Sequence, residues 1–260
     1  MFDSGLGGLS VWKVLNAFLP KESVVYYGDS RFAPYGTRTN NQIRQRSFCI
    51  TEKLLENGAK LIVVACNTAT AAAIEDLRMA YPEVPFVGME PAVKPASLLS
   101  KTGHIGVLAT QGTLKGDLFR KNQDKYGPYV TIHFREGKGL VELAESNMVN
   151  SQQSRKLLSE YIRPMMQANV DQLVLGCTHY PLFIPIIREI TGGAMNIIDP
   201  ADAIARRTKD LLISHRMMNT SGNTMATRFF TSGNADSMLK MLHTVDKQSD
   251  GFDIAGFNCQ

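Results

Sequence analysis

The chain has 260 residues, of which 44% are hydrophobic and 20% are charged, as is ordinary for a globular protein of one large or two medium domains. Its net charge of +4 is small and its 28 basic residues are spread along the chain, which suits a small anionic ligand and gives no reason to expect nucleic acid. No apolar run is long enough to span a bilayer and no signal peptide is recognisable, so we expect a cytoplasmic protein without a membrane segment.

Strand-like and helix-like segments alternate along the chain. Strands are expected at the start, at 23–29, 61–65, 84–89, 104–110, 130–135, 173–176, 195–198 and 227–231. Helices are expected up to 19, at 39–57, after 67 to 79, and at 112–126, 139–147, 151–168 (interrupted near Pro164), 181–190, 201–218 and 234–242. Residues 219–226 and the tail after 242 are predicted to be irregular. This alternation predicts parallel sheets flanked by helices.

Two segments of the chain have the same pattern, an apolar strand that ends in a cysteine. They are LIVVACNT, which contains Cys66, and LVLGCTH, which contains Cys177. About eight strands would also fit a TIM barrel, but the two cysteines lie 111 residues apart (177 − 66), each within its own α/β series. We therefore predict two similar, pseudo-symmetric α/β domains with mainly parallel sheets and an active site in the cleft between them. The predicted domains are residues 1–91 with 201–260, and residues 92–200.

The cysteine spacing favours acid/base chemistry over metal binding. The four cysteines, Cys49, Cys66, Cys177 and Cys259, form no C-x-x-C pair, which argues against a zinc knuckle or a thioredoxin-like motif. Cys66 and Cys177 are expected at the carboxyl ends of parallel strands, where open α/β sheets bind ligands. A thiol with a pKa of about 8.5 can act as an acid or a base near neutral pH. One thiolate could remove a proton from one face of a carbon while an opposing thiol delivers a proton to the other face.

Polar residues around the two thiols are candidate ligands for a substrate carboxylate. Hydrogen-bond donors follow each cysteine, and Asp3 is a candidate neighbour of a thiol, although a plain helix N-cap is an alternative role for it. The glycine-rich segment 5–8 could let backbone N–H groups approach an anion. The loop at Tyr35 and Gly36 could present an aromatic edge and free backbone amides, and a simple surface turn is the alternative interpretation.

Four motifs together resemble those of the glutamate racemases, in the cofactor-independent aspartate/glutamate racemase superfamily. They are FDSGLGG at 2–8, PYG at 34–36, ACNTATA at 65–71 and GCTHYPL at 176–182. The resemblance implies two α/β domains, a homodimer, and interconversion of L- and D-glutamate to supply D-glutamate for peptidoglycan. It also implies glutamate as the small-molecule partner, with no metal, pyridoxal phosphate or nucleotide cofactor.

The resemblance also implies roles for individual residues. Cys66 and Cys177 would be the two acid/base thiols, with Asp3 supporting the first and His179 supporting the second. Glu145 aligns best with an acid that supports the second thiol, whereas Glu142 stands where the family has a proline, and a solvated helix face is the alternative for this stretch. The residues implied to line the substrate site are Asp3, Ser4, Tyr35, Gly36, Asn67, Thr68, Thr178 and His179.

The chain departs from the family pattern at its start. Only Met1 precedes Phe2, where family members carry a longer strand. We expect either that the start lies upstream or that Asp3 and Ser4 lie at a frayed terminus, with weakened activity. Three rivals to glutamate racemisation remain at this point: a racemase for aspartate or hydantoin, a non-catalytic anion-binding module, and a redox-active thiol pair.

Overall fold

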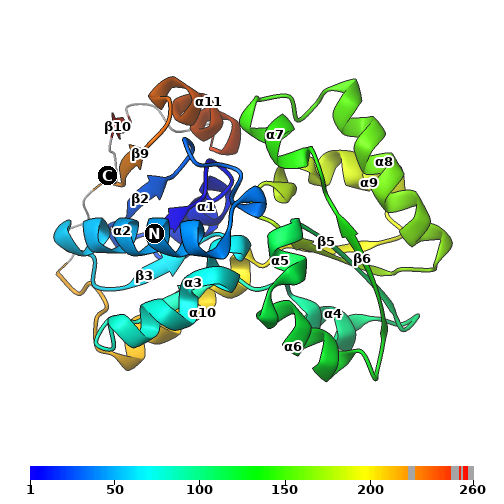
Figure 1. The fold of residues 1–260 in the computed structure, drawn as a ribbon, viewed down its shortest axis with the longest axis horizontal. Helices are drawn as coiled ribbons and strands as arrows, with labels where there is room; N and C mark the ends of the chain where they lie inside the picture. Colours follow the sequence, from blue (N-terminus) through cyan, green and yellow to red (C-terminus); the bar gives the residue numbers. More distant parts are fainter. Residues whose placement is uncertain (222–225, 247–251, 253, 257–260) are drawn as a thin grey trace. The chain divides into compact units, whose positions relative to one another are not determined.

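The structure, a computed structural model, describes residues 1–221, 226–246, 252 and 254–256. The chain divides into two compact units (Figure 1). The first unit comprises Met1–Met89 and Ala201–Gln260, and the second comprises Glu90–Pro200. Each unit is built around one sheet, and the strand pairs described in both sheets are parallel. The predicted α/β class with mainly parallel sheets is therefore confirmed.

The first unit contains a six-stranded sheet with the order β10-β9-β2-β1-β3-β4. Strand β9 pairs with β2 from Val25↔Arg228 to Gly28↔Thr231, so a segment from the end of the chain extends the sheet formed by its beginning. The strands are β1 (Phe2–Asp3), β2 (Val25–Gly28), β3 (Ile62–Val64), β4 (Phe86–Gly88), β9 (Arg228–Thr231) and β10 (Ile254–Gly256).

Strand β1 is short but lies in the interior of this sheet. Phe2 pairs with Tyr27 of β2 and with Val64 of β3, so the strand is held on both sides. The amino group of Met1 donates a hydrogen bond to the carbonyl oxygen of Val25 at 2.6 Å, and Asp3 is fully buried. The expectation of a frayed terminus is therefore wrong. Pairing with two strands remote in sequence fixes the backbone, and no local pattern reveals such pairing.

Helices cover both faces of the first sheet. Helix α1 packs against α10 and α11, whereas α2 packs against α3, and right-handed crossovers place these two groups on opposite faces. Helix α2 begins with a capping box, in which the Thr39 and Gln42 side chains each accept from the other's backbone N–H. The helical segments are α1 (Leu9–Phe18), α2 (Asn40–Glu56), α3 (Asn67–Ala80), α10 (Ala201–Ser214), α11 (Ala235–Val245) and the 3₁₀ turn η1 (Tyr35–Thr37).

The second unit contains a four-stranded sheet with the order β6-β5-β7-β8. Its strands are β5 (His104–Ala109), β6 (Thr131–Glu136), β7 (Gln172–Gly176) and β8 (Asn196–Ile198). Its helical segments are α4 (Val93–Leu99), α5 (Gln111–Lys115), α6 (Asp117–Tyr126), α7 (Leu140–Glu145), α8 (Gln152–Gln167), η2 (Tyr180–Phe183) and α9 (Ile184–Thr191).

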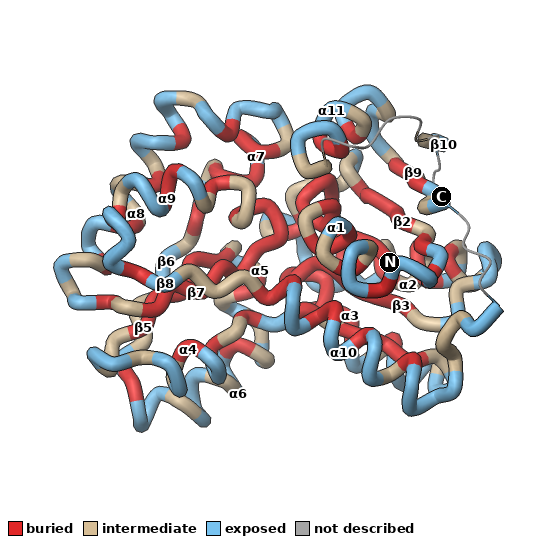
Figure 2. Tube along the Cα trace, turned by 180° about the vertical axis from the view of Figure 1, so that it is seen from behind, coloured by how far each residue is buried: buried red, intermediate tan, exposed pale blue. Residues whose placement is uncertain are grey.

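Strand β7 divides the core of the second unit by alternation of its side chains. Leu173 and Leu175 pack on the face covered by α7, α8 and α9, while Val174 packs on the opposite face with α4 and α6. All three side chains are fully buried. Figure 2 shows the interior strands β2, β3 and β7 mostly buried, and the helices with both buried and exposed stretches. The buried position of β7 fixes where Cys177 follows it.

Several predicted elements need correction. Helix α4 was not expected, because no helix was placed between the strands at 84–89 and 104–110; its Pro95 lies in the first turn, where proline is tolerated. Helix α8 runs through Pro164 to Gln167 without the expected interruption. Gly116 divides the helix expected at 112–126 into α5 and α6. In the region expected to be irregular, β10 forms, while 222–225 and Cys259 lie outside the described residues.

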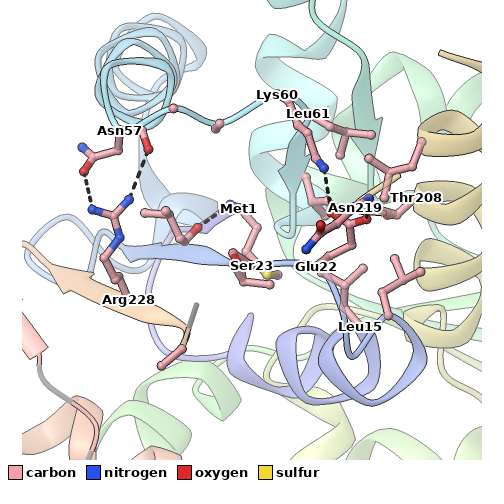
Figure 3. A pocket seen from close by; sticks show the side chains of 18 residues that line it. Met1, Leu15, Glu22, Ser23, Asn57, Lys60, Leu61, Thr208, Asn219 and Arg228 are labelled. Carbon is pink, nitrogen blue, oxygen red and sulfur yellow. Dashed lines mark hydrogen bonds and ion pairs between the residues drawn. The ribbon is translucent and has the colours of Figure 1, made fainter. Parts of the chain in front are cut away.

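A cavity of about 390 Å³ opens beside the amino terminus (Figure 3). Met1, Val25 and Leu61 line it, so it lies toward the amino ends of β1, β2 and β3. At its rim, Lys60 forms an ion pair with Glu22 at 2.8 Å. Ligands of parallel α/β sheets bind at the opposite, carboxyl ends of the strands. None of the helices among the described residues has the length and apolarity needed to cross a membrane.

Candidate active site

The carboxyl edge of the first sheet brings several predicted site residues together. Strand β1 ends at Asp3, and Cys66 follows two residues after the end of β3. The Cys66 Sγ lies 3.5 Å from the Ser4 Oγ. The Asp3 carboxylate accepts a hydrogen bond from the backbone N–H of Gly5 at 3.0 Å, which stabilises the turn that carries Ser4. The first residues of the chain therefore form a polar environment around the thiol of the first unit.

Cys66 is the N-cap of helix α3. Its extended backbone ends the strand, and its Sγ accepts a hydrogen bond from the backbone N–H of Ala69 at 3.4 Å. A helix N-terminus stabilises negative charge, so this position favours the thiolate form. Cys66 is only 5% exposed and is a free cysteine.

Asn67 and Thr68 form the first turn of α3 and are buried. Within the described part of the chain, neither Oδ1 nor Nδ2 of the Asn67 amide has a hydrogen-bond partner. A buried amide without partners costs about 1–3 kcal/mol, and native structures contain few of them. A bound ligand with polar atoms would satisfy this amide.

The loop that carries Tyr35 and Gly36 contacts helix α3, whose N-cap is Cys66. The Tyr35 hydroxyl does not point to solvent; it donates a hydrogen bond to Asp29 Oδ2 at 2.6 Å. Burial raises the pKa of Tyr35 well above its usual value, and the charges of Asp29 and Cys66 raise it further. No described residue accepts a hydrogen bond from the backbone N–H of Tyr35 or Gly36. This loop therefore offers backbone donors rather than a phenol.

Asp29 is a buried residue that the sequence analysis missed. It follows β2 directly, at the same carboxyl edge as Asp3 and Cys66. Its position as the last residue of the expected strand 23–29 was a usable signal, because polar residues at strand ends of a parallel sheet point to a ligand site.

The second unit presents its thiol in the same way. Cys177 directly follows β7, and Thr178 and His179 come next; all three are buried. The Cys177 Sγ lies 3.7 Å from His179 Nδ1, and His179 Nε2 lies 2.5 Å from Glu145 Oε1. Glu145 is the last residue of α7, whereas Glu142 lies exposed in its first turn. The structure thus brings Cys177, His179 and Glu145 into one chain of contacts.

The hydrogen-bond partners of His179 favour the protonated form of its imidazole. Burial lowers the pKa of His179, but hydrogen bonds to Cys177 and Glu145, together with their charges, outweigh burial and raise the pKa well above its usual value. A protonated imidazole beside a sulfur stabilises the thiolate, and the Glu145 carboxylate stabilises the imidazolium in turn. The arrangement can accept and release a proton at Cys177 without leaving an isolated buried charge.

Comparison with known proteins identifies the class to which this fold and these strand-end cysteines belong. The chain matches the model of the Asp/Glu/Hydantoin racemase family over residues 9–208, so it belongs to that family. Glutamate racemase of Ectopseudomonas mendocina is 43% identical over 242 residues, which cover 93% of this chain and 92% of that protein. Glutamate racemase of Herpetosiphon aurantiacus is 41% identical over 93% of this chain and 94% of its own length.

Solved structures agree with the sequence relatives. A glutamate racemase isoform from Bacillus anthracis superposes with a TM-score of 0.88 at 29% identity, covering 99% of this chain and 96% of that one. Escherichia coli glutamate racemase, solved with L-glutamate and the activator UDP-MurNAc-ala, gives a TM-score of 0.85 at 32% identity, with coverages of 98% and 95%. The resemblance to glutamate racemases is confirmed, and the chain is an amino-acid racemase, an isomerase.

Proposed function

We propose that the chain racemises glutamate by moving one proton at Cα between Cys66 and Cys177, and that it thereby supplies D-glutamate for peptidoglycan. The observation that carries this proposal is that an interior strand of each unit, β3 and β7, leads into a buried free cysteine. Relatives named glutamate racemase support the choice of substrate, and the Francisella tularensis and Escherichia coli enzymes were solved with D-glutamate and L-glutamate, respectively.

The proposed reaction conserves atoms and charge. One cysteine, as thiolate, takes the proton from Cα and becomes a thiol, and the electron pair of the broken C–H bond passes into the substrate carboxylate. The other cysteine, as thiol, then donates its proton to the opposite face of Cα and becomes a thiolate. The product is the mirror image of the substrate, and the reverse reaction exchanges the two roles. The steps use only side chains of the protein, with Asp3 supporting Cys66, and His179 and Glu145 supporting Cys177.

Polar groups beside each thiol are proposed to hold the substrate. In the first unit these are Ser4, the Asn67 amide, Thr68 and the loop amides of Tyr35 and Gly36; in the second they are Thr178 and His179. Donors placed where charge develops as the α-proton leaves would lower the barrier. The Asn67 amide supports this assignment, because it has no hydrogen-bond partner among the described residues.

Isotope exchange tests the two-thiol reaction directly. L-glutamate is incubated with the protein in D₂O, and the α-proton is followed by NMR while optical rotation is followed in parallel. We expect deuterium in the D-glutamate product, while L-glutamate recovered early keeps its proton, because the two bases exchange protons with solvent separately. Deuterium appearing equally early in both enantiomers would indicate a single base and contradict the mechanism.

Two single substitutions complete the test. Cys66→Ser and Cys177→Ser should each abolish racemisation while circular dichroism shows that the fold is kept. The same assay with aspartate and with a hydantoin compares substrates, and a higher kcat/KM for either than for glutamate would overturn the choice of substrate. Binding of glutamate without any exchange would overturn catalysis and leave a binding module.

A further inference from the structure

Asp29 accepts hydrogen bonds from three separate segments of the first unit. Its Oδ2 accepts from the Tyr35 hydroxyl at 2.6 Å and from Arg46 Nε at 2.9 Å. Its Oδ1 accepts from Arg46 Nη2 at 2.9 Å and from the Ser232 Oγ at 2.7 Å. A carboxylate has about four acceptor positions, so these four bonds occupy the group. Asp29 is fully buried and is therefore unsuited to exchange a proton with substrate.

The three partners come from different elements, and Ser232 is brought to Asp29 by the pairing of β9 with β2 at Gly28↔Thr231. Arg46 lies on α2, Tyr35 opens the turn η1, and Ser232 follows β9, 203 residues after Asp29. The backbone of Asp29 joins this network to the site, since its N–H donates to the carbonyl oxygen of Asp3 at 3.0 Å. The network thus ties the loop of residues 30–36 to the edge of the sheet that carries Asp3.

The same loop has little apolar support against α2. A cavity of about 240 Å³ is lined by Tyr35, Ile43, Arg46 and neighbouring residues, so the loop and the helix are not close-packed there. The Arg46 guanidinium instead stacks on the Phe32 ring at 4.0 Å from its centroid, and the Ser232 Oγ accepts a hydrogen bond from the Arg31 backbone N–H at 3.1 Å. The ionic and hydrogen-bonded network around Asp29 therefore helps to hold the loop, together with the buried Tyr35 ring, which is 1% exposed.

From this geometry we propose that Asp29 is a positioning residue for substrate binding: it holds the backbone amides of Tyr35 and Gly36 in place beside the Cys66 thiol. This inference rests on the proposed function, which assigns those amides to the substrate. The carboxylate acts through Tyr35 and Arg46 and does not touch the reacting atoms. Its loss should therefore weaken binding of glutamate and leave the proton-transfer steps nearly unchanged.

The sharpest test removes one bond of the network and keeps the ion pair. Tyr35→Phe deletes only the hydroxyl that binds Asp29, so the fold and the Asp29–Arg46 pair remain. We expect KM for glutamate to rise about tenfold while kcat changes less than about twofold, as for a lost hydrogen bond to a charged group. The matched control is Tyr81→Phe, which deletes a hydroxyl bonded to Glu52 at 3.3 Å in the same unit and should leave both constants unchanged. A KM within about twofold of the unmodified protein would overturn the proposal, as would an equal loss in kcat.

A second measurement does not depend on catalysis. Asp29→Asn replaces an acceptor by an amide that cannot receive both Arg46 donors, so we expect faster deuterium uptake in the peptide 30–38. Arg44→Gln is the control on the same helix, because Arg44 pairs with Asp76 at 2.5 Å on the exposed side, and its uptake should be unchanged. Unchanged uptake in Asp29→Asn would overturn the proposal even if glutamate is turned over. If the unmodified protein does not turn over glutamate, the proposed function fails, while this exchange measurement still decides whether Asp29 holds the loop.

Discussion

His179 Nε2 lies 2.5 Å from Glu145 Oε1, and on the other side of the ring Nδ1 lies 3.7 Å from the Cys177 Sγ. The imidazole thus bridges a carboxylate and a thiol, both of which favour its protonated form. In the folded chain the pKa of His179 lies well above its usual value because these two partners outweigh its burial. The second-unit thiol therefore lies beside an imidazole whose protonated form the carboxylate stabilises.

Glu145→Gln tests this pairing. Without the carboxylate the pKa of His179 should fall, so the imidazole should lose its proton at a lower pH and stabilise the Cys177 thiolate less. We expect kcat to fall about 10- to 100-fold, less than the roughly 10²- to 10⁴-fold effect of a residue that transfers the proton itself, because Glu145 acts through His179. The alkaline limb of the pH–rate profile should also move to lower pH. Glu142→Gln on the same helix is the control, and a larger effect there than at Glu145 would contradict the assignment.

The same pair predicts how stability depends on pH. A histidine whose folded pKa is raised stabilises the fold fully below its unfolded pKa of about 6.5, and this contribution is lost as the pH rises through the folded pKa. In Glu145→Gln, the free energy of unfolding from urea titrations should decline less between pH 6 and pH 9 than in the unmodified protein. An identical decline in both proteins would show that Glu145 does not hold the proton on His179.

Asn67 offers a test that separates stability from function. Its buried amide has no partner among the described residues, so replacing it with an apolar side chain should relieve a desolvation cost. We expect Asn67→Leu to raise the free energy of unfolding by about 1 kcal/mol and to abolish glutamate turnover. Asn122→Leu on α6 is the matched control, because the Asn122 amide donates to the Leu118 carbonyl oxygen at 3.0 Å. Destabilisation of Asn67→Leu relative to this control would contradict the role of the amide as an unfilled ligand group.

Much of the architecture could be predicted because it depends on local pattern. The β-branched run that ends at Cys66 and the similar run that ends at Cys177 each predict a buried parallel strand with its thiol at the carboxyl end. Glu145 was assigned from its alignment with the family, and the structure places it beside His179. Periodicity, strand composition and motif spacing are properties of short windows, which is why these features were accessible.

The features that were missed depend on contacts between distant residues. The acceptor role of Asp29 needs Arg46 from α2 and Ser232 from the last part of the chain, and neither is marked by local sequence. Met1 is likewise fixed by its hydrogen bond to Val25 and by the pairing of β1 with β2 and β3. Helix α4 was also missed; it has only seven residues, and its Pro95 lies in the first helical turn, where proline is tolerated.

Gly8 is constrained by space rather than by backbone conformation, since its φ of −61° is ordinary for any residue. A Cβ at this position would lie 2.6 Å from the Asp3 Cβ and 2.9 Å from the Tyr26 hydroxyl, which itself donates to the Gly5 carbonyl oxygen. Gly8→Ala should therefore displace the turn that carries Ser4. We expect a loss of about 1–3 kcal/mol in stability, typical of overpacking, together with a fall in glutamate turnover. Gly256→Ala, where an added Cβ meets nothing within 4 Å, should change neither quantity.

The cavity beside Met1 lies where a continuation of strand β1 ahead of Met1 would run. Phe2 pairs with Tyr27 on β2 and with Val64 on β3. If the same register continued, three residues added before Met1 would face Val25, Val24 and Ser23 on the β2 side. On the β3 side they would face Ile62, Leu61 and Lys60. All of these except Ile62 line the cavity (Figure 3). Burial also lowers the pKa of the Met1 amino group from 8.0 to about 5. The folded chain therefore holds this amine in a site that suits the neutral form, beside space that suits apolar side chains.

Adding residues ahead of Met1 should relieve both constraints, and pH separates them. The Met1 amine binds a proton below about pH 8 in the unfolded chain but only below about pH 5 in the folded chain. Its burial therefore lowers the free energy of unfolding as the pH falls from 8 to 5, by roughly 4 kcal/mol at the limit. An added Ile-Ala-Val-Ile should raise the free energy of unfolding at pH 8 by about 1–3 kcal/mol by filling the cavity, and by more at pH 5. An added Gly-Ser-Gly-Ser moves the charge away without filling the cavity, so it should stabilise at pH 5 and have little effect at pH 8. Urea titrations at the two pH values measure all three proteins. If the apolar extension is no more stable than the unextended chain at pH 8, the cavity does not accept a continued strand.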